Sequence, residues 1–272
     1  MKKRIVSLFL VLVLLCTCMM LSGCAGGKNA PESADKSVAA VIKEALDKNE
    51  NLDSMSAEMK MEMNMAAEGM TMSVPITAKI KAKNLKSDNT ISFVDLTMSM
   101  LGQEIVVEMY QEGQWAYVVM GDIKYKSNLK DMQGEMDYAD NAKDMLKEIP
   151  EDLLKDVELV KAEDGSQTAT ISLSGEKFSE IYNELIKDVV SETGTEMGEM
   201  KISDAVVTIT MVGGFVTVYD VAFTMDMTVE GVSSTTEAKV TLTYENPGQD
   251  VTITPPEGYQ DFEELSMDDS LL

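Results

Sequence analysis

Histidine is absent from this sequence of 272 residues, and arginine occurs once, at Arg4. Nucleophile pairs in which histidine is the base are therefore excluded, as are zinc sites with histidine ligands. Arginine clamps on phosphate groups are excluded everywhere after the N-terminal segment. Enzyme classes that depend on these groups do not fit the sequence.

Positive charge is also scarce. The chain has 23 lysine and arginine residues against 47 aspartate and glutamate residues, which gives a formal net charge of −24. Binding to a nucleic acid backbone requires basic residues that neutralise phosphates, so a nucleic acid partner is excluded. Attraction to anionic lipid headgroups is disfavoured for the same reason.

The N-terminal segment has the pattern of a secretory signal. Basic residues at positions 2–4 precede the uncharged apolar run Ile5–Leu21, and such a segment is excluded from fold reasoning. The run closes on Leu21-Ser22-Gly23-Cys24, which resembles the lipobox of bacterial lipoproteins. The resemblance implies cleavage after residue 23 and a diacylglyceryl thioether on Cys24. A plain transmembrane anchor or an ordinary signal peptide is the alternative.

Removal of residues 1–23 also settles the use of cysteine. Cys16 and Cys18 leave with the signal, so Cys24 is the only cysteine of the 249-residue mature chain and no disulfide can form. Two acyl chains hold a protein firmly on a bilayer without spanning it. We therefore expect an extracytoplasmic protein that a lipid anchors to the cell membrane, in a Gram-positive organism.

The mature chain changes period after a short helix. Residues 24–36 form a polar tether, and an apolar stripe in 38–46 predicts a helix that ends near residues 49–53. From Met55 apolar and polar residues alternate, which is typical of strands with one wet face. Eleven strands are predicted, at residues 55–65, 70–80, 89–100, 104–111, 114–120, 123–127, 157–163, 167–174, 200–212, 215–229 and 232–245.

Two further helices interrupt the strands. Apolar residues at helical spacing occur in 136–149 and 176–190. Hairpin-length connections between the strands predict an antiparallel sheet. The organisation is one α+β, β-dominated domain over residues 37–254, followed by an acidic tail over 255–272 that runs on the surface.

This order of elements resembles the lipoprotein-carrier superfamily of LolA-like and LppX-like proteins, including its poorly characterised Gram-positive lipoproteins. The resemblance is one of topology and covers most of the mature chain. It implies a curved antiparallel sheet, a half-barrel, whose concave side is covered by helices. The helices at 136–149 and 176–190 would then be a lid.

Methionine is unusually frequent, with 23 residues that cluster in the alternating strands. One interpretation is that these side chains fill the core face. The second is that they line a cavity, because flexible thioethers adapt to apolar guests. A Cu(I) site is the third, although no histidine assists it. The predicted ligand-binding residues are Met61, Met63, Met72, Met98, Met100, Trp115, Phe223 and Met225.

No other motif indicates chemistry. The acidic clusters near residues 135–137, 257–263 and 268–269 lack the spacing of a calcium loop and are interpreted as solvated surface. No cofactor, metal site or catalytic residue is predicted, so we expect a non-enzymatic protein that binds a lipid or an acyl chain. A protein-interaction or sensor module is the alternative, and a secreted hydrolase the third. The oligomeric state is left open.

Overall fold

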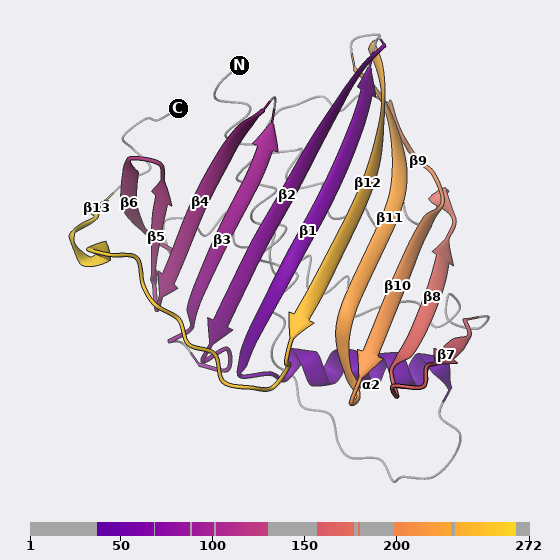
Figure 1. Ribbon diagram of the computed structural model, residues 1–272, viewed down its shortest axis with the longest axis horizontal. Coiled ribbons are helices and arrows are strands. Elements are labelled where there is room, and N and C mark those ends of the chain that lie inside the picture. The colour runs from indigo at the N-terminus through magenta and orange to yellow at the C-terminus, as the bar shows by residue number, and fades with distance from the viewer. Residues whose placement is uncertain are drawn as a thin grey trace.

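The computed structural model describes residues 37–67, 69–87, 89–100, 102–129, 157–176, 179, 199–229 and 232–264 (Figure 1). These residues form one sheet of thirteen strands with an α-helix and a short 3-10 helix. The predicted signal, tether and Cys24 lie outside the described residues. So do the predicted helix at 136–149, nearly all of the one at 176–190, and the tail from residue 265.

The elements follow one another mostly as hairpins. The helices are α2 (Val38–Glu50) and η2 (Tyr259–Asp261). The strands are β1 (Ser54–Ala67), β2 (Met70–Lys83), β3 (Ile91–Met100), β4 (Gln103–Glu112), β5 (Trp115–Met120), β6 (Ile123–Asn128), β7 (Leu159–Lys161), β8 (Gln167–Leu173), β9 (Glu199–Ile202), β10 (Ala205–Val212), β11 (Phe215–Val229), β12 (Val232–Glu245) and β13 (Glu263–Glu264).

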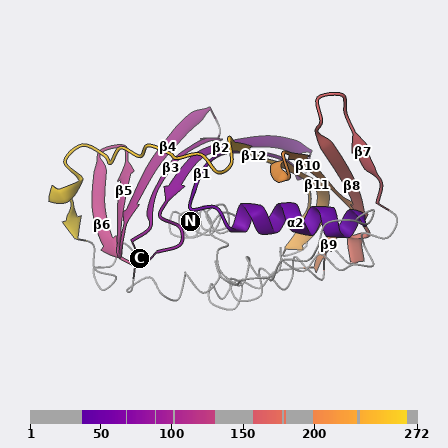
Figure 2. The ribbon, with the colours of Figure 1, turned by 90° about the horizontal axis from the view of Figure 1, so that it is seen from below.

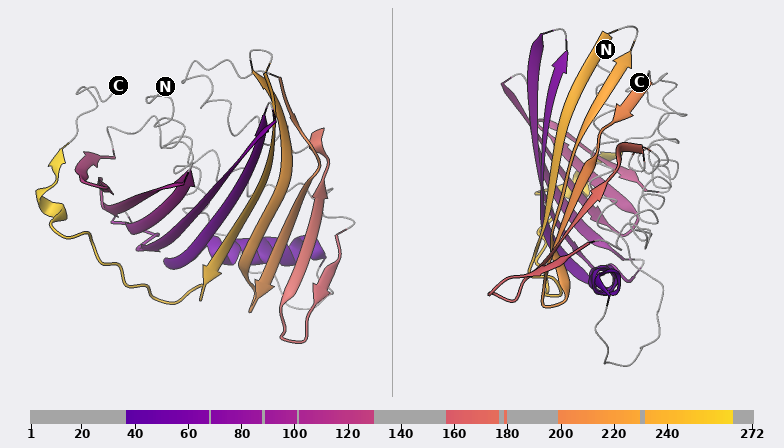
Figure 3. Two further views of the ribbon diagram at one scale, coloured as in Figure 1. Left: turned by 45° about the horizontal axis from the view of Figure 1, so that its top comes forward. Right: turned by 90° about the vertical axis from the view of Figure 1, so that its right-hand side faces the viewer.

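The sheet is an antiparallel meander with β1 near its middle. Its order is β13-β6-β5-β4-β3-β2-β1-β12-β11-β10-β8-β7, and β9 pairs with β11. Figures 2 and 3 show that the sheet curves strongly and stays open, with α2 on its concave side. The predicted fold class, a curved antiparallel half-barrel dominated by β-structure, is confirmed.

Helix α2 begins and packs as its sequence predicts. The Ser37 hydroxyl caps its first turn by accepting a hydrogen bond from the Ala40 N–H at 3.2 Å. Ile42 and Ala45 are buried against β8, β10 and β11 in one of the two apolar clusters of the sheet. The helix therefore covers one end of the concave face. The strands extend beyond this end without contact to the helix.

One predicted strand, 200–212, is wrong, because the structure divides it into β9 and β10. Ser203 and Asp204 interrupt it with side chains that bond to neighbouring backbone. The Ser203 hydroxyl accepts from the Thr224 N–H at 3.1 Å, and the Asp204 carboxylate accepts from the Gly175 N–H at 2.9 Å. Short polar side chains compete with the strand ladder in this way.

The C-terminal segment is attached to the sheet by one buried side chain and a short strand. Phe262 is buried, and β13 pairs with β6 in the sheet's parallel contact (Figure 1). Tyr259 stacks edge-on against Tyr110 and Tyr117 at 5.2 and 5.0 Å between ring centroids. Aromatic contacts of this geometry stabilise the segment on the convex face. Residues up to 264 are therefore part of the packed sheet.

Candidate functional site

The register of the sheet decides which predicted site residues share a face. Met61 lies opposite Ile76 on β2 and Val240 on β12, and Ile76 lies opposite Met98 on β3. Met63 lies opposite Ala238, which also pairs with Phe223 on β11. Directly paired residues project to the same side of a sheet, so β1, β2, β3 and β11 bring these side chains to the concave face.

Two more methionine pairings extend this surface toward the β1–β2 turn. Met65 lies opposite Met72, and Thr236 connects Met65 to Met225 across β12. We call the resulting surface the methionine face. Its members are Met61, Met63, Met65, Met72, Met98, Phe223 and Met225. Met100 is the last residue of β3, paired with Gln103, and its position has the same parity as Met98.

Trp115 does not belong to this surface. It pairs with Glu112 on β4, whose parity is that of the convex face. The Lys126 ammonium lies over the indole ring at 5.5 Å from its centroid, a favourable cation–π contact. The prediction that Trp115 joins the methionines in one site is therefore wrong.

Burial along β1 separates a closed core from the methionine face. Met55, Ala57 and Met59 are buried, whereas the alternate residues from Met61 to Met65 are only partly buried. The core residues pack with the buried positions of β2 and β3 in the second apolar cluster. The methionine face continues this core beyond the end of the strands that α2 crosses (Figure 1), and it is partly exposed except at Met98, which is buried.

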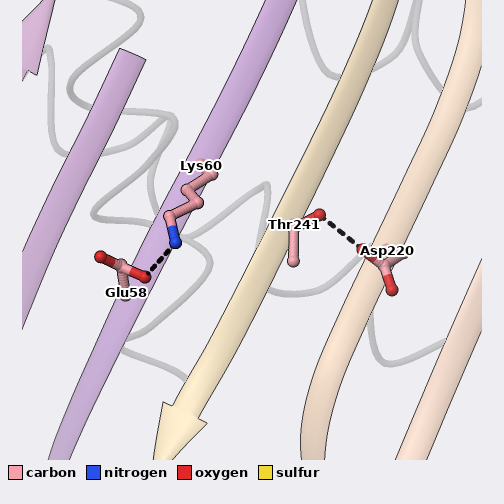
Figure 4. A network of polar contacts seen from close by, with 4 residues as sticks. All are labelled: Glu58, Lys60, Asp220 and Thr241. Carbon is pink, nitrogen blue, oxygen red and sulfur yellow. Dashed lines mark hydrogen bonds and ion pairs between the residues drawn. The ribbon is translucent and has the colours of Figure 1, made fainter. Parts of the chain in front are cut away.

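The two faces of the sheet differ completely in charge along β1, β2, β11 and β12. The positions that share the parity of the methionine face hold no aspartate, glutamate or lysine in the registers of these four strands. The convex face carries the charges, such as the Lys60–Glu58 ion pair at 2.7 Å and the Asp220 carboxylate that accepts from the Thr241 hydroxyl (Figure 4). An uncharged concave surface suits an apolar ligand.

Polar groups lie at the end of the concave face that α2 covers. The Asn49 side chain donates to the Val216 carbonyl at 2.8 Å and accepts from the Val216 N–H at 2.9 Å. The pairing of β11 with β12 starts only at Val218. At Val216 the Asn49 amide therefore supplies the hydrogen bonds that a neighbouring strand would otherwise supply. Asn49 also hydrogen-bonds the Tyr244 side chain.

Two tyrosines share this end. Burial is the main cause that raises the pKa of Tyr219 to about 12, and the neighbouring Tyr244 is the second cause. Burial also raises the pKa of Tyr244 to about 12, against the opposing effect of the Asn49 hydrogen bond. Both hydroxyls are therefore protonated donors over the whole physiological pH range. Sequence reasoning missed Asn49 and Tyr244, whose roles depend on contacts distant in the chain.

These pKa values predict a loss of stability in alkali. A group whose pKa is higher in the folded state binds its proton more tightly there, so its contribution is complete below about pH 10 and is lost as the pH rises toward 12. We expect Tyr219 to contribute about 2–3 kcal/mol to this loss. Urea unfolding of wild type and Tyr219→Phe at about pH 8 and pH 11.5 measures it. An equal loss in both proteins would contradict the assignment.

Neither metal ions nor membrane-spanning helices are indicated by the described ranges. Within them, no three histidine, cysteine, aspartate or glutamate residues lie close enough together to hold a metal ion. In the same ranges, no helix has the length and hydrophobicity needed to cross a membrane.

The fold and this surface define a class of protein, the half-barrels whose curved antiparallel sheet carries an uncharged, apolar concave face. The chain belongs to the family of unknown function DUF6612, whose model matches residues 37–259. A sequence search of the curated proteins finds no match.

Solved structures with a similar arrangement have low identity to the chain. LprF from Mycobacterium bovis is 11% identical with a TM-score of 0.41, and the match covers 80% of this chain and 96% of LprF. A DUF1329 family protein from Desulfovibrio piger is 8% identical with a TM-score of 0.26, covering 80% and 95%. An AttH-type protein from Nitrosomonas europaea is 8% identical with a TM-score of 0.24, covering 82% and 59%.

Proposed function

We propose that this protein is a lipid-anchored lipoprotein that binds an apolar ligand, a lipid or acyl chain, on its methionine face. The observation that carries the proposal is a continuous apolar surface across five neighbouring strands, β3, β2, β1, β12 and β11, with no charged residue on it. Burying such a surface against hydrocarbon is favourable by about 25 cal/mol per Å². The function is binding rather than catalysis.

The choice of methionine supports an adaptable ligand. Methionine occupies fully buried positions on this side of the sheet, such as Met55, Met59 and Met98, and also the partly buried alternate positions from Met61 to Met65. Methionine side chains repack around guests of different shape. A surface that must hold an acyl chain and release it gains from this flexibility.

The proposed location follows from the N-terminal segment. A diacylglyceryl group on Cys24 would hold the domain on the outer side of the cell membrane through the tether 24–36. The sheet would then meet lipids at the bilayer surface or the acyl chains of other lipoproteins. A Gram-positive cell envelope is the proposed setting.

Replacing Met61 and Met63 together by glutamine tests the proposal. Glutamine has nearly the length of methionine but carries a polar amide, so a ligand on this face loses apolar contact with two side chains. We expect the affinity for an apolar ligand to fall at least about tenfold. Native mass spectrometry of the mature chain, with Cys24 replaced by serine, measures the fraction that carries lipid.

Met70→Gln is the matched control. Met70 lies at the β1–β2 turn and is 71% exposed, so the same exchange there should leave lipid binding unchanged. Equal lipid occupancy in wild type and in the Met61/Met63 double variant would contradict the proposal. Absence of bound lipid from every variant, together with capture of a protein, would favour the interaction module instead.

A further inference from the structure

The structure assigns a polar anchor to the proposed ligand, and this deepens the proposed function on which it rests. We infer that the Tyr219 hydroxyl donates a hydrogen bond to an uncharged polar group of the ligand, such as an ester carbonyl, while the hydrocarbon lies on the methionine face. The ligand class is therefore a neutral acyl lipid. The juxtaposition of one tyrosine with an uncharged surface carries this inference.

Tyr219 lies where the two apolar clusters meet. It packs against the cluster under α2 and against the cluster of β1, β2 and β3. Its register partner Leu242 pairs in turn with Met59, the residue before the methionine face on β1. Tyr219 therefore lies at the inner end of the apolar surface, where the methionine face meets the core beside α2.

The polar neighbours of Tyr219 already have partners. Asn49 uses its amide on Val216 and bonds Tyr244. Within the described ranges the Tyr219 hydroxyl itself makes no hydrogen bond. A polar group that is buried without a partner costs free energy, and a ligand oxygen would remove that cost.

The length of β11 from Tyr219 to the far end of the surface suits one acyl chain. Tyr219 and Met225 occupy the same face of β11 six positions apart, which corresponds to about 20 Å. One leaflet of a bilayer has a hydrocarbon thickness of about 15 Å. A whole acyl chain can therefore extend from Tyr219 along β11, β12 and β1.

Charge decides between neutral and anionic head groups. The four strands that would surround the ligand have no lysine at positions of this parity, so these strands would offer no cation to a buried carboxylate or phosphate. Such a burial is unfavourable by several kcal/mol. An ester or hydroxyl group is uncharged, so its burial has no such cost. One neutral hydrogen-bond donor is enough to satisfy its oxygen.

Three radiolabelled probes test the inference on the mature chain with Cys24 replaced by serine. Dioleoylglycerol, palmitate and hexadecane are each delivered from phosphatidylcholine vesicles, and the label on the protein is counted after the vesicles are removed. We expect Tyr219→Phe to weaken dioleoylglycerol binding about threefold to tenfold and to leave hexadecane binding unchanged. Wild type should bind dioleoylglycerol more tightly than palmitate.

Two control variants separate the hydroxyl from packing. Tyr117→Phe removes a hydroxyl on the convex face and should change nothing, whereas Met63→Gln should weaken dioleoylglycerol and hexadecane alike. Dioleoylglycerol binding that ignores Tyr219→Phe overturns the inference, as does an equal loss with hexadecane or tighter binding of palmitate. Failure of all three probes to bind overturns the proposed function as well.

Discussion

Replacement of Cys24 by serine is expected to prevent lipidation of this protein and to release it from the membrane fraction of its cell. In the proposed anchor the lipid is attached through the Cys24 sulfur, and a serine hydroxyl cannot form that thioether. Without two acyl chains, a chain with 47 acidic residues has little attraction to a bilayer. Metabolic labelling with palmitate followed by fractionation measures both results, and label and membrane association should be lost together.

Cys16→Ser and Cys18→Ser are the matched controls. Both residues lie in the apolar run that precedes the proposed cleavage site, so their replacement should leave labelling and membrane association intact. The alternative anchor is the apolar run itself, retained as a transmembrane segment. Loss of palmitate from Cys24→Ser with full retention in carbonate-washed membranes would be explained by that anchor and would contradict lipidation as the means of attachment.

Most of the sheet could be predicted because its side-chain period is regular. The alternation from Met55 to Met65 identifies both the strand and its apolar face, and the glycine turns mark where each hairpin reverses. The same regularity placed Met61, Met63 and Met72 on one surface, since their register follows from hairpin geometry. Phe223 joins them only through the pairing of β1 with β12, which is not a hairpin.

Trp115 shows where that reasoning was not carried far enough. Gly113 and Gln114 form a two-residue turn, which sets Trp115 directly opposite Glu112. An acid one residue before such a turn indicates a wet face, so the tryptophan could have been placed there from the sequence. Its aromatic character alone suggested a ligand site and gave no information about the face.

Contacts between distant segments could not be predicted in this way. The pairing of β13 with β6 and the bonds of Asn49 to Val216 join residues more than a hundred positions apart. No local period encodes such contacts. Local polar residues such as Ser203 and Asp204 gave a weak signal for the break between β9 and β10, because two short polar residues in a strand favour side-chain bonds to backbone.

Asn49→Ala is expected to destabilise the fold by about 3–5 kcal/mol, the largest loss we expect from a single side chain. The substitution leaves the Val216 N–H and carbonyl without partners at a residue that is 1% exposed. It also removes the hydrogen bond to Tyr244. Each buried group that loses its partner costs about 1–3 kcal/mol. Urea unfolding of the mature chain measures the change in the free energy of unfolding.

Asn51→Ala supplies the comparison, because the same residue type lies two positions further on at the end of the same helix. Its side chain donates to the Asp47 carbonyl of its own helix at 2.7 Å and is exposed, so its loss should cost under about 1 kcal/mol. If Asn49→Ala destabilises the fold as little as Asn51→Ala, then α2 is held by the packing of Ile42 and Ala45 alone. A large difference means that one amide joins the helix to β11, and with it fixes the end of the concave face where Tyr219 lies.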